Sequence, residues 1–205
     1  MGISSISRNQ SLYKNQSLYK TQEQNQQRNS QKLASGKRVN SAADDAAGLA
    51  IIQKLMKQQK GLDAGTRNAA AAQDMVNVAE GGLSMISDSL QRMRELSVQA
   101  SNTAIYGADD RAAIQQEVSQ LNAYVSDAAG STQFNNMNLL DGTMTGAHVA
   151  SNPDGSGMTI NMPNASSGAL GISGYNVTGN FDISSIDNAL NNVSSARGSL
   201  GAAYN

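Results

Sequence analysis

Apolar residues are spaced most regularly between residues 51 and 100. One row of apolar or small side chains recurs every seven positions, and a second row lies four positions before each member of the first. Such a heptad pattern, sustained for about seven heptads, predicts a long helix that packs against partner helices. The rows are Leu55, Leu62, Ala69, Val76, Leu83, Leu90, Ser97 and Ile51, Gln58, Gly65, Ala72, Ala79, Ile86, Met93.

Two further helices are predicted downstream. Tyr106-Gly107 interrupts the first pattern, which limits the first helix to about residues 42–104. A second helix is expected over 109–129, where an apolar stripe advances in steps of four and three residues. A third is expected over 184–205, where the heptad pattern returns with small residues beside it.

The segment 131–181 has a different character, because Gly, Asn, Ser and Thr dominate it and both prolines lie in it. Residues 158–162 alternate apolar and polar side chains, which is typical of a strand. Asn152-Pro-Asp-Gly155, directly before them, favours a turn. The sequence therefore predicts a small β-hairpin region here.

Residues 1–40 form a separate N-terminal segment in which the hexapeptide NQSLYK occurs at 9–14 and again at 15–20. No apolar residue occurs from Lys20 to Lys32. Two interpretations stay open: a Gln/Asn-rich segment that is disordered in the isolated chain, or a helix that forms only beside a partner. Residues 41–205 are then a rod domain. The predicted fold class is mainly α, a long rod-like antiparallel helical bundle with a small β-hairpin region.

Composition and charge exclude several classes of protein. Aromatic residues make up 4% of the 205 residues and Trp is absent, which does not suit a large layered core. The formal net charge is -1, so no nucleic-acid partner is expected. Cys is absent, which excludes disulfides and thiol chemistry. No apolar run approaches the roughly 18 residues of a membrane span, and no apolar leader is recognised, so neither membrane insertion nor a cleaved secretory signal is expected.

No group of residues indicates catalysis, a cofactor or a metal. Adjacent residues on a helix point about 100° apart, so Asp44 and Asp45 do not converge on one atom. They are more simply interpreted as charges that favour a helix N-terminus. His148 is the single histidine, and the Ser and Thr residues have no partner base. We therefore expect no enzyme.

Four segments in order carry a resemblance to a known family. These are Leu33–Ile51 (LASGKRVNSAADDAAGLAI), Ser89–Gln99 (SLQRMRELSVQ), Thr132–Gly142 (TQFNNMNLLDG) and Val193–Gly201 (VSSARGSLG). The chain resembles bacterial flagellins, the subunits of the flagellar filament. The resemblance implies a secreted structural protein of the bacterial flagellum. Its partners would be other flagellin subunits, the flagellar export apparatus and an export chaperone.

Two departures from the family keep alternatives open. Family members have a more apolar N-terminal helix, and they continue for several dozen residues beyond the position of Asn205. The resemblance thus implies that the C-terminal inner-core segment is lacking. The alternatives are a hook-filament junction protein and a secreted receptor-binding fragment that does not polymerise.

The resemblance also implies a recognition surface. Gln91, Arg92, Leu96 and Glu117 match the positions at which the family is bound by Toll-like receptor 5, an innate receptor of the host, and by neighbouring subunits. Counting about eleven residues back from the Tyr106-Gly107 turn reaches Gln99 to Met93, and about eleven forward reaches Glu117, so the two sets are expected at a similar height. We expect these four side chains to be coplanar and largely exposed. The simpler alternative is a solvated polar helix face.

Overall fold

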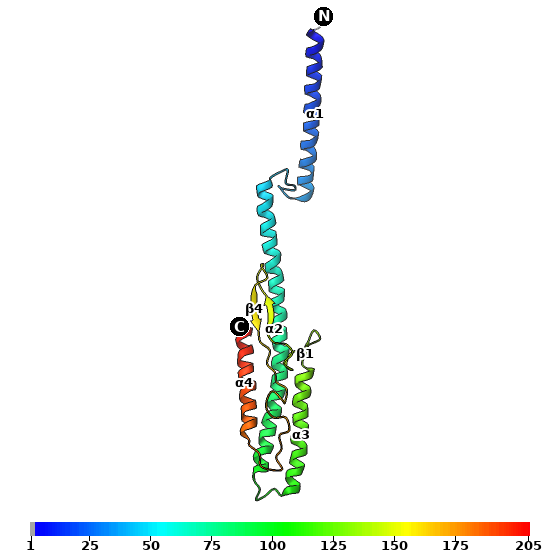
Figure 1. Cartoon of the computed structure of the whole chain (residues 1–205). Coiled ribbons are helices and arrows are strands. Elements are labelled where there is room, and N and C mark those ends of the chain that lie inside the picture. The colour runs from blue at the N-terminus through cyan, green and yellow to red at the C-terminus, as the bar shows by residue number, and fades with distance from the viewer. Residues whose placement is uncertain (1–2) are drawn as a thin grey trace. The chain divides into compact units, whose positions relative to one another are not determined.

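The computed structural model describes residues 3–205, with side chains from residue 9 onward. The described residues form four helices and two antiparallel strand pairs, which confirms the mainly α fold class (Figure 1). The helices are α1 (Ile3–Ser35), α2 (Ala46–Ser101), α3 (Ala108–Ser131) and α4 (Ser184–Tyr204). The strands are β1 (Gln133–Phe134), β2 (Met137–Asn138), β3 (Ala147–Ala150) and β4 (Gly157–Ile160). The chain divides into one unit up to Lys60 and a second from Gly61 to Asn205.

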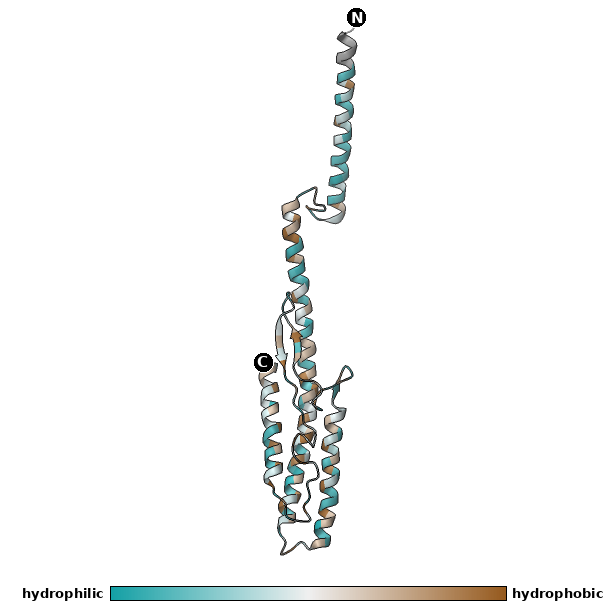
Figure 2. Cartoon of the chain, viewed as in Figure 1, coloured by the Kyte–Doolittle hydropathy of each residue, from teal (hydrophilic) through white to brown (hydrophobic). Residues whose placement is uncertain are grey.

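The first unit contains α1, whose side chains from residue 9 to 31 are all exposed. Both copies of NQSLYK therefore display their Leu and Tyr side chains to solvent. Figure 2 shows the largely hydrophilic colouring of this helix. Helicity without burial agrees with either interpretation of the segment, so its disorder in the isolated chain stays a prediction.

A hydrogen-bonded turn joins α1 to α2. The Asp44 carboxylate accepts bonds from the backbone N–H groups of Asn40 and Ser41, both at 3.3 Å, and its Oδ1 lies 3.4 Å from Lys32 Nζ. The Asp45 carboxylate accepts a 2.8 Å bond from the Gly48 N–H and caps α2. This cap explains why α2 begins at Ala46 rather than near residue 42.

The second unit is built around α2, along which α3 and α4 run antiparallel (Figure 1). The predicted heptad rows are buried at Gly65 and from Ala72 onward, while Ala69 is exposed. The buried row residues form the centre of the core with Ile114, Val118 and Val125 of α3 and Ile186 and Val193 of α4. Farther toward the N-terminus of α2 the same rows are exposed, at Ile51, Leu55 and Leu62. The heptad pattern therefore extends beyond the part of α2 that is covered.

The hairpin β3–β4 lies close against α2 at a glycine. A Cβ on Gly65 would collide with the backbone carbonyl of Ser151, and Asn68 Nδ2 donates a 2.8 Å hydrogen bond to the Ala150 carbonyl. The predicted strand at 158–162 is β4, and the predicted turn before it contains Gly155 with a φ of +84°. The β-hairpin region is confirmed.

The pair β1–β2 adds a hairpin that the sequence analysis missed. Its two turn residues, Asn135 and Asn136, have φ values of 49° and 61°. Positive φ at both central positions is typical of a type I′ turn, for which Asn is well suited.

Five loops between β2 and α4 repeat one local motif. In each, the side-chain oxygen of an Asp or Asn accepts hydrogen bonds from the backbone N–H and the hydroxyl of the Ser or Thr two residues later. These bonds hold the pKa of Asp141, Asp154 and Asp182 below the ordinary value. The pairs are Asp141–Thr143, Asp154–Ser156, Asn164–Ser166, Asn176–Thr178 and Asp182–Ser184.

Candidate functional site

An ion pair joins α2 to α3 at the predicted surface. Arg92 Nε donates to Glu117 Oε1 at 2.9 Å, and its Nη1 donates to Glu95 Oε2 at 3.1 Å. The hydrogen bond to Glu117, followed by that to Glu95, raises the pKa of Arg92. The expectation that residues 92 and 117 lie at one height is confirmed.

The prediction that Leu96 is exposed is wrong, because its side chain retains only 2% exposure. Leu96 lies next to Ser97 of one heptad row and three residues after Met93 of the other, and both are fully buried. In this part of the chain α3 and α4 both cover α2, so the buried sector of α2 is wider than the two rows. Leu96 supports the surface from beneath.

The exposed residues of the predicted surface are Gln91, Arg92 and Glu117, and together with Glu95 they form what we call the Arg92 surface. Gln91 Nε2 donates a 3.4 Å bond to Ser87 Oγ. Sequence reasoning missed Glu95, although its position three residues after Arg92 is a spacing at which helix side chains meet.

A second cross-helix contact lies beside the Arg92 surface. The Tyr124 hydroxyl donates to the sulfur of Met85 at 3.5 Å, and both side chains are exposed. The α2–α3 face thus offers a charged part and an apolar part side by side. The sequence pattern alone does not predict this apolar part.

The opposite side of α2 is joined to α4 by two ion pairs. Arg94 Nε lies 2.6 Å from Asp187 Oδ1, and Arg197 Nη2 lies 2.6 Å from Glu80 Oε1. Glu80 precedes Arg94 along α2, whereas its partner Arg197 follows Asp187 along α4. The two pairs therefore fix an antiparallel register. They hold α4 in place and leave the α2–α3 face open.

Outside the Arg92 surface, the described titratable groups do not form a further candidate site. No group of three or more His, Cys, Asp or Glu residues within the described part of the chain could hold a metal ion. His148 Nε2 lies 3.2 Å from the Gly155 carbonyl at the exposed β3–β4 turn. Among the described helices, none combines the length and apolarity that a membrane crossing requires.

The fold defines a helical-bundle protein built on one long helix. The family model described as the bacterial flagellin N-terminal helical region matches residues 6–145, and this chain belongs to the bacterial flagellin family. It is 37% identical over 197 residues to flagellin FlaB1 of Treponema pallidum, a match that covers 85% of this chain and 68% of that protein. It is 36% identical over 193 residues to a flagellin of Listeria monocytogenes, covering 84% and 67%.

Two further comparisons agree. The chain is 48% identical over 116 residues to the flagellar filament 33 kDa core protein of Treponema phagedenis, covering 57% of this chain and 40% of that one. The crystal structure of Bacillus cereus flagellin matches with a TM-score of 0.58 and 26% identity, over 67% of this chain and 82% of that chain. The matched stretch thus spans between 40% and 68% of the length of the three sequence relatives.

Proposed function

We propose that this chain is a structural subunit of the bacterial flagellar filament and assembles with other flagellin subunits through its helices. The observation that carries the proposal is the uncovered end of the heptad pattern. Ile51, Leu55 and Leu62 continue the rows of the core, yet their side chains are exposed. An apolar heptad row without a partner favours association with another helix.

The proposal includes the route to this location. The chain would be exported unfolded through the flagellar export channel, with an export chaperone, and would become extracellular as part of the flagellum. The absence of Cys supports this route, because no disulfide has to break or form when an unfolded chain is threaded.

The assembly is tested in a bacterial strain in which this chain is the only flagellin. Leu55→Glu and Leu62→Glu put a charge in the exposed row, and Gln59→Glu puts the same charge at an exposed polar position between them. We expect electron microscopy to show filaments with the Gln59 variant and a loss of filaments with the two Leu variants. The secreted amount of each variant is measured in parallel, which separates assembly from export.

Three outcomes count against the proposal. Normal filaments from both Leu variants would remove the proposed role of the exposed row. Immunogold labelling confined to the base of the filament would support the alternative of a hook-filament junction protein. A chain that never enters filaments but binds its receptor would support the alternative of a non-polymerising secreted binding protein.

A second proposal assigns recognition by Toll-like receptor 5 to the Arg92 surface, underlain by Leu96. Arg is one of the residue types most often found as a binding hot spot. The ion pairs with Glu95 and Glu117 fix the guanidinium before a partner arrives, which lowers the ordering cost of binding.

A further inference from the structure

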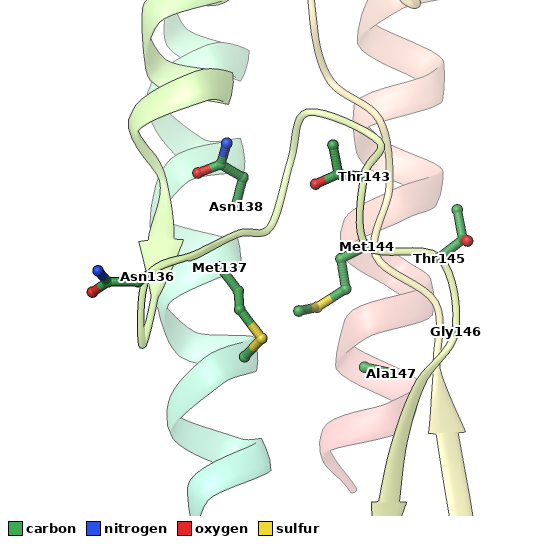
Figure 3. A pocket seen from close by; sticks show the side chains of 8 residues that line it. All are labelled: Asn136, Met137, Asn138, Thr143, Met144, Thr145, Gly146 and Ala147. Carbon is green, nitrogen blue, oxygen red and sulfur yellow. The ribbon is translucent and has the colours of Figure 1, made fainter.

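The geometry points to Met137 and Met144 as an oxidation site whose sulfoxide loosens the β1–β2 hairpin from α2. Met137 lies on β2, and Met144 lies in the segment that leads into β3. Figure 3 shows the two side chains pointing toward one another. The oxidant would be hydrogen peroxide or a related peroxide.

Two hollows meet at this methionine pair. One, of about 450 Å³, is apolar and is lined by Met75 of α2, Phe134 of β1 and Val149 of β3 together with both methionines. The other, of about 490 Å³, lies on the polar side and is lined by residues such as Asn138 and Thr143, again together with both methionines (Figure 3). Met137 and Met144 therefore separate an apolar hollow from a polar one, and a small oxidant can approach them.

Met137 is exposed enough to react with a peroxide, and its apolar neighbours make the sulfoxide that forms unfavourable for hairpin docking. Its side chain is 43% exposed, whereas Met75 is buried at 6%. The thioether sulfur attacks one peroxide oxygen, the O–O bond breaks, and the second oxygen leaves as hydroxide, which takes up the proton lost by the transferred oxygen and becomes water. The sulfur loses two electrons to the peroxide and becomes a sulfoxide, which is a polar group.

The polar sulfoxide would stand where the hairpin contacts apolar side chains of α2. A polar sulfoxide packs less well against the apolar side chains of that hollow than a thioether does, which weakens the docking of the hairpin. The loosening should remain local, because Leu139 and Leu140 between the two methionines are fully buried. Their backbone is also fixed, by the Leu139 N–H to the Thr132 carbonyl at 3.0 Å and the Ala165 N–H to the Leu140 carbonyl at 2.8 Å.

The chain offers a matched control for this proposal. Met158 on β4 is also 43% exposed but lines neither of the two hollows. Met158→Leu therefore removes a methionine of equal overall exposure. Met137→Leu combined with Met144→Leu removes the proposed pair while it nearly conserves side-chain volume.

The test treats the full chain with hydrogen peroxide, maps sulfoxides by peptide mass spectrometry and measures amide hydrogen exchange across residues 133–147. We expect the amides of 133–138 and 143–147 in oxidised wild type and oxidised Met158→Leu to exchange about tenfold faster than before treatment, while the hydrogen-bonded Leu139 amide stays slow. The Met137→Leu/Met144→Leu variant should keep its untreated exchange rate. Treatment with a methionine sulfoxide reductase should restore slow exchange in the wild type.

Each contrary outcome overturns the proposal. Slow exchange over 133–147 with Met137 fully converted to sulfoxide would show that the pair has no influence on docking. Fast exchange in the oxidised double variant would assign the effect to another methionine. Oxidation of Met137 no faster than that of the fully buried Met93 would show that the site is not accessible.

Discussion

Tyr124 donates its hydroxyl hydrogen to the sulfur of Met85, and each residue lies seven positions from a member of the Arg92–Glu117 ion pair. Seven residues are about two helical turns, so both contacts lie along the same facing edges of α2 and α3. One antiparallel register therefore sets both contacts. This register places Glu117 opposite Arg92, so that Glu117, and not a residue one turn away on α3, belongs to the Arg92 surface.

Arg92→Ala should reduce the affinity for Toll-like receptor 5 about thirtyfold, the loss expected when a charged hot spot of about 2 kcal/mol is removed. Stability should change by only about 0.5 kcal/mol, because the ion pairs of Arg92 are half exposed. Receptor binding by surface plasmon resonance and thermal melting of the same samples measure the two effects.

The matched control is Arg94→Ala. Arg94 has the same 49% side-chain exposure as Arg92 but faces α4, where it pairs with Asp187. It should leave receptor binding unchanged. Equal binding losses in the two variants would reduce the Arg92 surface to a solvated helix face.

Leu96→Ala should destabilise the second unit by about 3 kcal/mol, because it leaves a cavity under the Arg92 surface. Denaturant unfolding followed by circular dichroism gives the change. The exposed Leu62, on the same helix, supplies the comparison, and Leu62→Ala should cost about 0.5 kcal/mol or less. Similar losses in both variants would contradict the burial of Leu96.

Gly65→Ala should lower stability by about 2 kcal/mol, because its methyl group would overlap the Ser151 carbonyl and push the β3–β4 hairpin away from α2. The helix residue Gly81 has nothing within 4 Å of an added Cβ, so Gly81→Ala should stabilise by up to about 1 kcal/mol. Melting temperatures that shift in opposite directions are the expected result. Melting temperatures that rise in both variants would exclude a close contact at Gly65.

Acid should open the turn between α1 and α2. The backbone N–H of Asn40, with help from Lys32 and Ser41, lowers the pKa of Asp44 below its ordinary 3.8. Because the folded-state pKa lies below the unfolded one, the stabilisation is present above about pH 3.8 and disappears as the pH falls through the folded value.

Nuclear magnetic resonance titration checks this prediction through the amide signals of Asn40 and Ser41, which should move together with the Asp44 carboxyl signal. Asp44→Asn removes the charge and should abolish the coupled movement. Amide signals that titrate unchanged in this variant would show that another group controls the turn.

The sequence predicted the helices well, because burial follows one period along α2, α3 and α4. It also placed Arg92 and Glu117 together, since counting outward from the turn near Gly107 fixes the register. It misjudged Leu96, whose burial depends on α3 and α4 both covering one part of α2. Such coverage is a tertiary property, and periodicity in a single helix does not contain it.

The β1–β2 hairpin was missed for a different reason. Its strands have two residues each, which is too short for an alternating pattern to appear. The adjacent Asn135-Asn136 was the available signal, because Asn tolerates positive φ. The Met137–Met144 pair could not be foreseen either, since it depends on how the chain returns from the hairpin toward β3.

The Asp/Asn to Ser/Thr loops have a consequence for the rate of folding. The two bonded residues of each loop are only two positions apart, so forming the loop costs little chain entropy. These loops can therefore form before distant parts of the chain meet. The ion pairs between α2 and α4 instead join residues 93 and 117 positions apart. Contacts of such high contact order form slowly, so the arrival of α4 on α2 should set the refolding time of the second unit.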